Sequence, residues 1–351
     1  MAEDQIQQLS ERVRAAAQAR EALEIRGQGS KAFYGRPVAG APLELSGYRG
    51  VVSYEPTELY ITARAGTPLS ELEAVLAEQH QMLPFEPPRF GGAGTIGGAI
   101  ATGLSGPRRP FAGAARDFVL GVRCLNGQGE DLRFGGQVMK NVAGYDLSRL
   151  ISGSLGTLGV LLEVSLKVLP RPRFEQSLSL DLPLAEGLAQ ADRWVGENLP
   201  LSGCAHDGER LHIRLSGAEP AVQAAARRIG GDTLDKSWWD GLRDHSLPFF
   251  RVDAPLWRLS LPPGARPTLS GEALHDWGGR QIWLRAAPDA HELQGLAARH
   301  GGHATLFRGP QDTETPVFQP LSAPLMALHR RLKQSLDPQG ILNPGRLYPG
   351  L

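Results

Sequence analysis

The stretch Arg89–Asp117 reads Arg-Phe-Gly-Gly-Ala-Gly-Thr-Ile-Gly-Gly-Ala-Ile-Ala-Thr-Gly-Leu-Ser-Gly-Pro-Arg-Arg-Pro-Phe-Ala-Gly-Ala-Ala-Arg-Asp and holds eight glycines. Glycine costs backbone entropy on folding, so this density requires a physical reason. A flexible linker would be rich in serine and other polar residues, whereas this stretch also carries Ile96, Ile100 and Leu104. Glycine mixed with small apolar residues indicates a tightly folded backbone whose amides can contact a flat or phosphorylated ligand.

Within this stretch, Gly92–Gly97 matches the dinucleotide fingerprint Gly-x-Gly-x-x-Gly. A Rossmann fingerprint must follow a strand and open a run of βαβ units. The residues before it include Pro84, Pro87 and Pro88, and prolines are not found in a central strand. We therefore discount the hypothesis that the chain is a NAD-dependent Rossmann dehydrogenase. A protein that bound a nicotinamide cofactor and no flavin would support that hypothesis again.

A second glycine-rich turn lies near the start of the chain. The first helix is predicted over residues 3–23, and Leu23–Arg26 follows as a short strand. Gly27-Gln-Gly-Ser-Lys31 comes directly after that strand. Such a turn can form an anion nest, with a serine hydroxyl and a lysine charge in addition to the backbone amides. Taken alone, it is as compatible with a plain turn as with a phosphate cradle.

A third informative stretch runs from Lys140 to Pro170. It predicts a short helix over residues 146–151, a glycine turn over 153–159, and an apolar strand over 160–169. After residue 172 the glycine turns end and strands alternate with helices up to about residue 325, which suggests a lid of two β-α-β halves on a mixed sheet. The lid carries Trp238, Trp239, Trp257, Trp277 and Trp283, which we expect to fill its core or an interface.

The composition limits the partners that the chain can have. The sequence has 351 residues, enough for two domains, and 37 basic residues balance 37 acidic ones. Nucleic acid is therefore not expected as a partner. The first residues lack a signal pattern, and no apolar run approaches the ~18 residues of a membrane span. We expect a cytoplasmic protein that meets the inner membrane only indirectly, through partners.

The two cysteines, Cys124 and Cys204, also limit the chemistry. They cannot form a disulfide scaffold. An iron–sulfur cluster usually takes four thiolates, so the chain cannot hold one by itself.

Four stretches, in order and spacing, resemble the FAD-binding proteins of the vanillyl-alcohol oxidase type, also called PCMH-type flavoproteins. They are Arg26–Ser30, Pro87–Asp117, Lys140–Val160 and the tail Asp337–Gly345, and the resemblance covers residues 20–175 and 325–347. It implies an α+β fold with a PCMH-type FAD-binding domain of two α/β subdomains over residues 1–172. A mixed-sheet, ferredoxin-like cap domain over 173–324 and a C-terminal segment over 325–351 that returns to the FAD domain complete that fold.

Within this family the chain is most similar to the smaller FAD-binding subunits of bacterial glycolate oxidases. The stretches that carry this similarity are Tyr54–Glu58, Phe85–Pro88, Gly103–Arg109 and Gly135–Tyr145. The resemblance implies non-covalently bound FAD, since the first loop has no His or Cys, and a small 2-hydroxy acid as substrate. It implies two partners, a larger FAD-binding catalytic paralogue and an iron–sulfur subunit that receives electrons.

The chain departs from the hydroxy-acid dehydrogenases of this family at three places. Leu155 stands where they carry Glu, Ala112 stands where they carry Tyr, and their metal-ligating His-x-Gly-Asp-Gly-Asn-x-His motif has no counterpart. His206 and His212, six residues apart, are interpreted as strand and turn residues, and no metal site is predicted. The catalytic residues stay unassigned. The flavin could act as an electron relay or as a second oxidation site, and a non-catalytic assembly subunit with a vestigial flavin site is the alternative.

We predict pyrophosphate contacts from the first loop, helped by the central glycine loop, and adenine contacts near Gly156 and Val160. The predicted cofactor-binding residues are Arg26, Gly27, Gln28, Gly29, Ser30, Lys31, Pro88, Gly94, Thr95, Gly97, Gly98, Thr102, Gly103, Ser105, Gly106, Gly113, Gly156, Gly159 and Val160. Each glycine could instead serve only its own turn.

Overall fold

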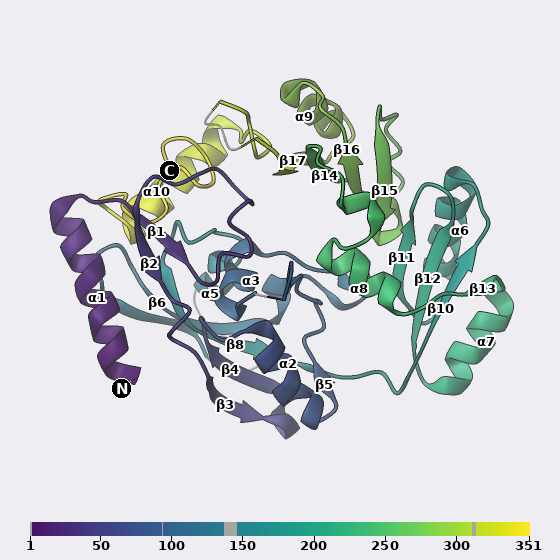
Figure 1. The fold of residues 1–351 in the computed structure, drawn as a ribbon, viewed down its shortest axis with the longest axis horizontal. Coiled ribbons are helices and arrows are strands. Elements are labelled where there is room, and N and C mark those ends of the chain that lie inside the picture. The colour runs from purple at the N-terminus through teal and green to yellow at the C-terminus, as the bar shows by residue number, and fades with distance from the viewer. Residues whose placement is uncertain (1, 93, 137–145, 311–313) are drawn as a thin grey trace.

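The computed structural model describes residues 2–92, 94–136, 146–310 and 314–351. Two β-sheets form its two halves, one built mainly from the first half of the chain and one from the second (Figure 1). The first sheet is antiparallel and has the strand order β3-β4-β8-β6-β7. Its strands are β3 Val51–Glu55, β4 Tyr60–Arg64, β8 Val160–Lys167, β6 Val119–Leu125 and β7 Asp131–Gly135.

The central strand β8 is buried on both faces, which explains its nearly continuous apolar sequence. On one face lie α2 (Leu69–Glu78) and α3 (Ile96–Thr102), packed into one apolar cluster with β4 and β8. On the other face lie α1 (Ala2–Ala19) and the parallel pair β1 (Leu23–Arg26) and β2 (Ala41–Glu44). Shorter elements complete this half: β5 Gln81–Met82, which pairs with β9 Leu169–Pro170, α4 Arg109–Ala112 and α5 Leu147–Ile151.

The Gly92–Gly97 segment leads into α3 without a preceding parallel strand, because the nearest strand upstream, β5, pairs antiparallel with β9. This is not the strand–turn–helix arrangement of a dinucleotide fingerprint. The structure therefore confirms that the fingerprint match is not a Rossmann site.

The second half, which we call the cap, is built on an eight-stranded sheet with the order β13-β10-β12-β11-β15-β16-β14-β17. Every neighbouring pair is antiparallel, so the expectation of a mixed sheet is wrong in this respect. Its strands are β10 Phe174–Leu180, β11 Leu201–His206, β12 Leu211–Gly217, β13 Asp232–Thr233, β14 Leu256–Ser260, β15 Glu272–Asp276, β16 Gln281–Arg285 and β17 His303–Arg308.

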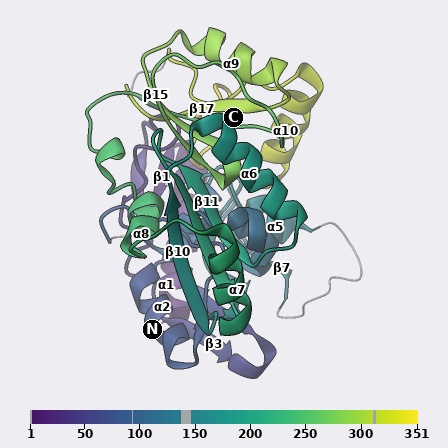
Figure 2. The same ribbon diagram turned by 90° about the vertical axis from the view of Figure 1, so that its right-hand side faces the viewer.

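Helices cover the outer face of the cap sheet: α6 (Leu184–Gly196) and α7 (Glu219–Ile229) lie in front of it in Figure 2, and α9 (Ala290–Arg299) packs on β14, β16 and β17. The short helix α8 (Ser237–Asp244) lies on the inner face, toward the first half (Figure 1). The cap tryptophans are largely buried, as expected for side chains that fill a core or an interface.

A buried ion-pair network joins the cap to the first half. Glu86 accepts from the guanidinium of Arg108 at 3.1 Å and pairs with that of Arg214, on β12, at 2.9 Å. The indole Nε1 of Trp277 donates to the carbonyl of Gly106 at 3.1 Å. Because both contacts join residues far apart in sequence, they fix the cap over the loop that carries Gly106.

The C-terminal segment returns to the first half, as expected. Helix α10 (Ala323–Leu336) precedes it, and residues 341–343 then run beside β1. The amide of Leu23 donates to the carbonyl of Ile341 at 2.8 Å, and the amide of Asn343 donates to the carbonyl of Leu23 at 3.0 Å. These residues of the C-terminal segment are more than 300 residues away from β1 in sequence, and Figure 1 shows that segment near β1.

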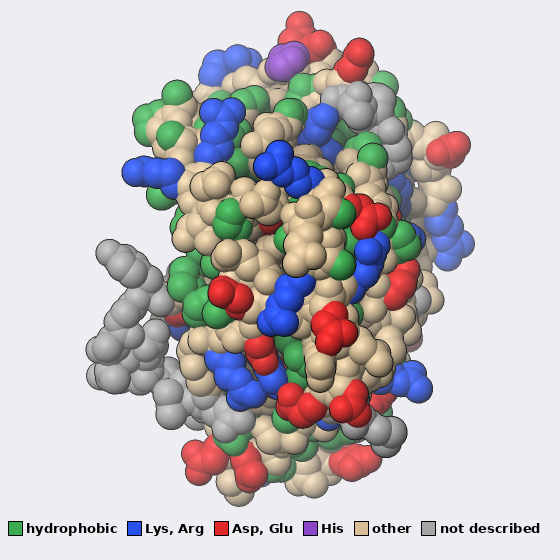
Figure 3. Space-filling view, turned by 90° about the vertical axis from the view of Figure 1, so that its left-hand side faces the viewer, with side chains coloured by type: hydrophobic (Ala, Val, Ile, Leu, Met, Phe, Trp, Pro, Cys, Tyr) green, Lys and Arg blue, Asp and Glu red, His purple; other side chains and the backbone are tan. Residues whose placement is uncertain are grey.

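The surface bears charges of both signs. Figure 3 shows basic and acidic side chains interspersed over the face it views, in agreement with a formal net charge of zero. Within the described ranges, no helix is both long enough and apolar enough to cross a membrane.

Candidate cofactor-binding site

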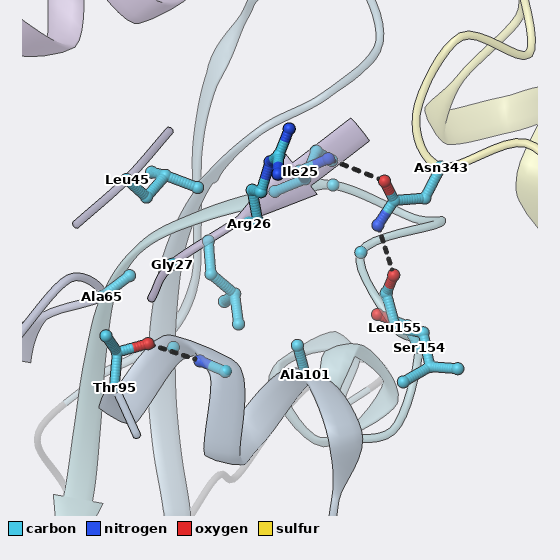
Figure 4. Close-up of a pocket in the computed structure, with 15 residues that line it drawn as sticks. Ile25, Arg26, Gly27, Leu45, Ala65, Thr95, Ala101, Ser154, Leu155 and Asn343 are labelled. Atoms are coloured by element: carbon cyan, nitrogen blue, oxygen red, sulfur yellow. Dashed lines mark hydrogen bonds between the residues drawn. The ribbon is translucent and has the colours of Figure 1, made fainter. Parts of the chain in front are cut away.

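Two adjoining cavities, with empty volumes of about 460 and 660 Å³, lie between β1, α3 and the returning C-terminal segment. Gly27, Thr95, Leu155 and Asn343 line both of them, so the two cavities form one continuous groove. Figure 4 shows how these residues come from distant parts of the chain and face a common space. The predicted site residues that line this groove are Arg26, Gly27, Gln28, Gly29, Ser30, Lys31, Thr95, Gly97, Gly98, Thr102, Gly156 and Gly159.

The loop after β1 supplies unused backbone donors. None of the amides of residues 27–31 donates a hydrogen bond to a described residue. Gly29 has a φ of +73°, a conformation that glycine adopts without strain and that helps turn successive amides to one side. A Cβ at Gly27 would lie 2.6 Å from Oγ1 of Thr95, so only glycine lets this loop approach α3 so closely. The loop therefore offers free amides of the kind that an anion nest requires.

Helix α3 presents its N-terminus to the same groove. Thr95 is its N-cap, and Oγ1 of Thr95 accepts from the amide of Gly98 at 3.2 Å. The amide of Gly97 is bound to the carbonyl of Ala65 at 2.8 Å. A Cβ at Gly97 would lie 2.6 Å from that of Ala65, whereas one at Gly98 would meet only Thr95 Oγ1, at 3.2 Å. Gly97 thus serves packing against β4, while Gly98 leaves its side of the groove open.

Lys31 places a cation at the edge of the groove. Its side chain is buried, and its Nζ lies 3.5 Å from the hydroxyl of Ser30 and 5.6 Å from the ring centroid of Phe90. Burial lowers the pKa of Lys31 to about 8, although the charge of Asp244 acts in the opposite direction. A buried ammonium whose only hydrogen-bond partner among the described residues is a hydroxyl is well suited to an incoming anion.

Two residues of the C-terminal segment complete the groove, and the sequence analysis did not select them. Asn343 accepts from the amide of Ile25 at 2.7 Å and donates to the carbonyl of Leu155 at 2.6 Å, which joins β1 to the glycine turn that precedes β8 (Figure 4). Arg346 donates to the carbonyls of Ala32 at 3.1 Å and Tyr34 at 2.9 Å. The run Asn-Pro-Gly at 343–345 was assigned to the returning C-terminal tail, but none of its residues was predicted to bind the cofactor.

The remaining predicted residues lie elsewhere. Pro88, Ser105 and Gly106 line a third cavity, beneath the cap. Gly94, Gly103, Gly113 and Val160 line none of these three cavities. Val160 is fully buried in the apolar cluster between the first sheet and α1, and its place beside an adenine stays a prediction. Of the third expected motif, residues 140–145 lie outside the described residues.

His206 and His212 occupy strand positions, as interpreted. His206, on β11, bonds through Nε2 to the carbonyl of Leu182 at 2.9 Å, and Nε2 of His212, on β12, lies 2.7 Å from Asp207 Oδ2. Across the part of the chain that the structure describes, no group of three or more His, Cys, Asp or Glu could hold a metal ion.

Comparison with known proteins identifies the family of the chain and the cofactor of that family. Residues 3–135 match the family model described as FAD binding domain, and residues 319–347 match the model of the FAD linked oxidases, C-terminal domain. Over 349 residues the chain is 50% identical to glycolate oxidase subunit GlcE of Escherichia coli (strain K12), with 99% of each chain covered. The chain belongs to this family of FAD-linked oxidoreductases.

Two further matches place the chain within the family. Glycolate oxidase subunit GlcD of Bacillus subtilis (strain 168) is 35% identical over 144 residues, which cover 41% of this chain and 30% of GlcD. The structure of p-cresol methylhydroxylase with substrate bound superposes with a TM-score of 0.75, covering 97% of this chain and 87% of that one at 14% identity. The fold is therefore that of the PCMH-type flavoproteins, and the cofactor of the family is FAD.

The residues of the groove fit this cofactor. The loop amides and Lys31 offer donors and positive charge to a pyrophosphate. The first cavity is apolar around Ile25, Leu45 and Leu161, as a flat ring system requires. No His or Cys lines either of the first two cavities in the described chain.

Proposed function

We propose that this chain is the FAD-carrying subunit of a complex that oxidises glycolate or a related 2-hydroxy acid. The observation that carries the proposal is the 50% identity to GlcE along 99% of both chains. The unpaired amides of residues 27–31, residues that line the groove, support it independently. When bound, FAD would accept a hydride from the α-carbon of the acid, and the chain's residues hold the cofactor and exclude water from it.

The proposal includes two partners: a larger FAD-binding paralogue, for which GlcD is the model, and an iron–sulfur subunit that receives the electrons. The chain's own cysteines support the need for the second partner. Cys124 and Cys204 are buried and free, and burial raises the pKa of each thiol to about 12. Thiols in this state are poor metal ligands, because the thiolate is the ligating form.

Purification of the native complex tests the proposal. We expect this chain to co-purify with a paralogous flavoprotein and an iron–sulfur protein, with on the order of one flavin per chain and absorbance near ~450 nm. We also expect denaturation to release the flavin, because the groove offers no covalent attachment residue among those described. A colourless chain that still assembles with the two partners would instead support an assembly subunit with a vestigial site.

The titration of Lys31 predicts how FAD affinity depends on pH. The free chain has a lowered Lys31 pKa of about 8, and a nearby phosphate would raise that pKa. Below pH 8 the lysine is already charged, so affinity should be nearly constant. Above pH 8 binding must take up a proton, so affinity should fall, approaching about tenfold per pH unit.

FAD titrations of flavin-free protein at pH 7, 8 and 9 measure this effect. The Lys31→Met variant is the control, because it removes the titrating group. We expect it to bind FAD more weakly at pH 7 and to show no step above pH 8. A wild-type affinity that falls in parallel with that of the variant would mean that another group causes the pH dependence.

A further inference from the structure

Helix α10 buries almost none of its apolar side chains. Of its 14 residues, only Lys333 is buried. Leu325 is 50% exposed, Leu328 is 43% exposed, and Leu332 is half-buried. These three leucines, which we call the leucine stripe, are three and four residues apart and so lie along one side of the helix. A helix of this length usually owes its stability to the packing of such a stripe, and within this chain that packing is incomplete.

The leucine stripe differs from the other exposed apolar groups. Val52, Val195 and Val252 are the other large apolar side chains that are exposed in the described ranges, and they lie singly on three separate segments. Single exposed apolar side chains are normal on a protein surface. Leu325 and Leu328 lie about one helical turn apart, so their exposed surfaces adjoin. Adjoining apolar surface of this kind indicates an interaction site.

The contacts that hold α10 in place do not use the leucine stripe. Lys333 donates to the carbonyls of Thr157 at 2.9 Å and Leu342 at 2.7 Å. It also pairs with the carboxylate of Asp337 at 2.6 Å. Lys333 follows Leu328 by five residues and therefore lies on a different side of the helix. Substitutions at the exposed leucines should leave this attachment intact.

The charged groups beside the stripe are basic. Arg330 and Arg331 are exposed, and neither makes a hydrogen bond or an ion pair with a described residue. No acidic residue occurs in the sequence between Glu314 and Asp337. A molecule that covers the stripe therefore meets two guanidinium groups without counter-charges. The complementary surface is apolar and carries carboxylates at its edge, and arginine is a residue type enriched in protein interfaces.

An anionic membrane and a second copy of this chain fit this surface less well. Helices that bind anionic lipid surfaces typically carry aromatic anchors or clusters of about 4–8 basic residues. Helix α10 has no aromatic residue, and its exposed basic residues are Arg330 and Arg331. A second copy would bring the same helix, which has no acidic residue to pair with these arginines.

We propose that the leucine stripe, with Arg330 and Arg331 beside it, is a docking surface for the larger FAD-binding paralogue. The inference rests on the proposed function and deepens it, because it names the part of this chain that meets one partner. We choose the paralogue because GlcD, its model, is like GlcE a glycolate oxidase subunit. Two half-exposed leucines supply far less than the ~800 Å² that each partner buries in a standard interface, so α10 forms one part of a larger contact.

Photo-crosslinking in the native complex tests which molecule covers the stripe. A Leu328→p-benzoylphenylalanine variant, expressed with its partners, should crosslink to the paralogue on irradiation. The same substitution at Val195, an exposed position on α6, is the control and should not do so. Four outcomes would overturn the proposal: a crosslink from position 328 to the iron–sulfur subunit, to a second copy or to lipid, or an equal crosslink from position 195.

Binding measurements with the purified paralogue test the contribution of the leucines. The Leu325→Gln/Leu328→Gln double variant should bind at least about tenfold more weakly than the wild type, a loss of ~1.4 kcal/mol. Its flavin content and melting temperature should match those of the wild type, because neither side chain is buried. Val195→Gln, which changes a side chain that is 41% exposed, should bind as the wild type does. An unchanged affinity in the double variant would overturn the proposal.

Salt dependence tests the contribution of the arginines. The affinity of the wild type for the paralogue should fall as salt is added, because ions screen charge pairs at a protein surface. Arg330→Gln/Arg331→Gln should bind more weakly at low salt and depend less on salt. Arg299→Gln, which changes an exposed arginine on α9, is the control and should behave as the wild type does. A double variant with the affinity and salt dependence of the wild type would contradict the proposed charge pairing.

The wild-type protein keeps this inference distinguishable from the proposed function. If the wild type binds no paralogous flavoprotein, the proposed function fails, and the docking surface fails with it. If the wild type binds the paralogue and the leucine double variant binds it equally well, only the docking surface is refuted.

Discussion

Replacing Gly98 by valine should abolish flavin retention while leaving the chain folded. Gly98 lines both cavities of the groove, and a Cβ there would meet only Oγ1 of Thr95, at 3.2 Å. The branched side chain would therefore extend into the space proposed for the pyrophosphate, not into the protein core. We expect FAD affinity to fall at least about a hundredfold, or ~2.7 kcal/mol, enough to lose the cofactor during gel filtration.

Two other glycines serve as matched controls for this experiment. Gly295→Val places the same side chain inside helix α9, where a Cβ would approach only the guanidinium of Arg299, at 3.5 Å. That variant should keep its full flavin content. Gly97→Val should instead misfold, because its Cβ would lie 2.8 Å from the carbonyl oxygen of Ala65. A Gly98→Val protein that retains one flavin per chain would remove α3 from the cofactor site.

Local sequence patterns were enough to find the parts of the groove that lie close together in the chain. Gly27 and Gly98 stood out because dense glycine among apolar residues has few structural explanations. Asn343 and Arg346 could not be selected in this way. Each acts through contacts with β1 or the loop after it, more than 300 residues away. The sequence Asn-Pro-Gly is the same in a turn that makes no distant contact and in one that binds a distant strand.

The cap shows where strand prediction from sequence fails. Strand β11 (Leu201–His206) is buried at every position, so it lacks the alternation that marks a half-exposed strand. The sequence analysis assigned no individual strand to the ranges of β11, β14 and β15, so the positions of Arg258 and Asp276 were not predicted. Neither residue belongs to a motif. They share a cavity only because the antiparallel order β15-β16-β14 brings their strands together.

The largest effect on folding should come from Glu86→Gln. Glu86 is held by the side chains of Arg108 and Arg214 and by the backbone amide of Arg108 at 2.9 Å. Burial acts to raise the pKa of Glu86, but Arg214 and Arg108 outweigh it and keep that pKa below its ordinary value. The glutamine would leave the nearly buried Arg214 without a counter-charge and Arg108 with Glu175 alone, so we expect the free energy of unfolding to fall by roughly 3–5 kcal/mol.

Urea denaturation at pH 7, followed by fluorescence of the cap tryptophans, measures this loss. Glu175→Gln is the control, because Glu175 also binds Arg108, at 2.7 Å, but its side chain is 33% exposed, so we expect a loss below ~1 kcal/mol. The pH dependence gives a second check. A lowered carboxylate pKa stabilises the fold above pH ~4.5 and loses that contribution as pH falls, so the gap between wild type and Glu86→Gln should narrow in acid. Two results would show that the charge of Glu86 does not hold the cap on the first half. One is an equal loss of unfolding free energy in both variants, and the other is a difference between wild type and Glu86→Gln that does not change with pH.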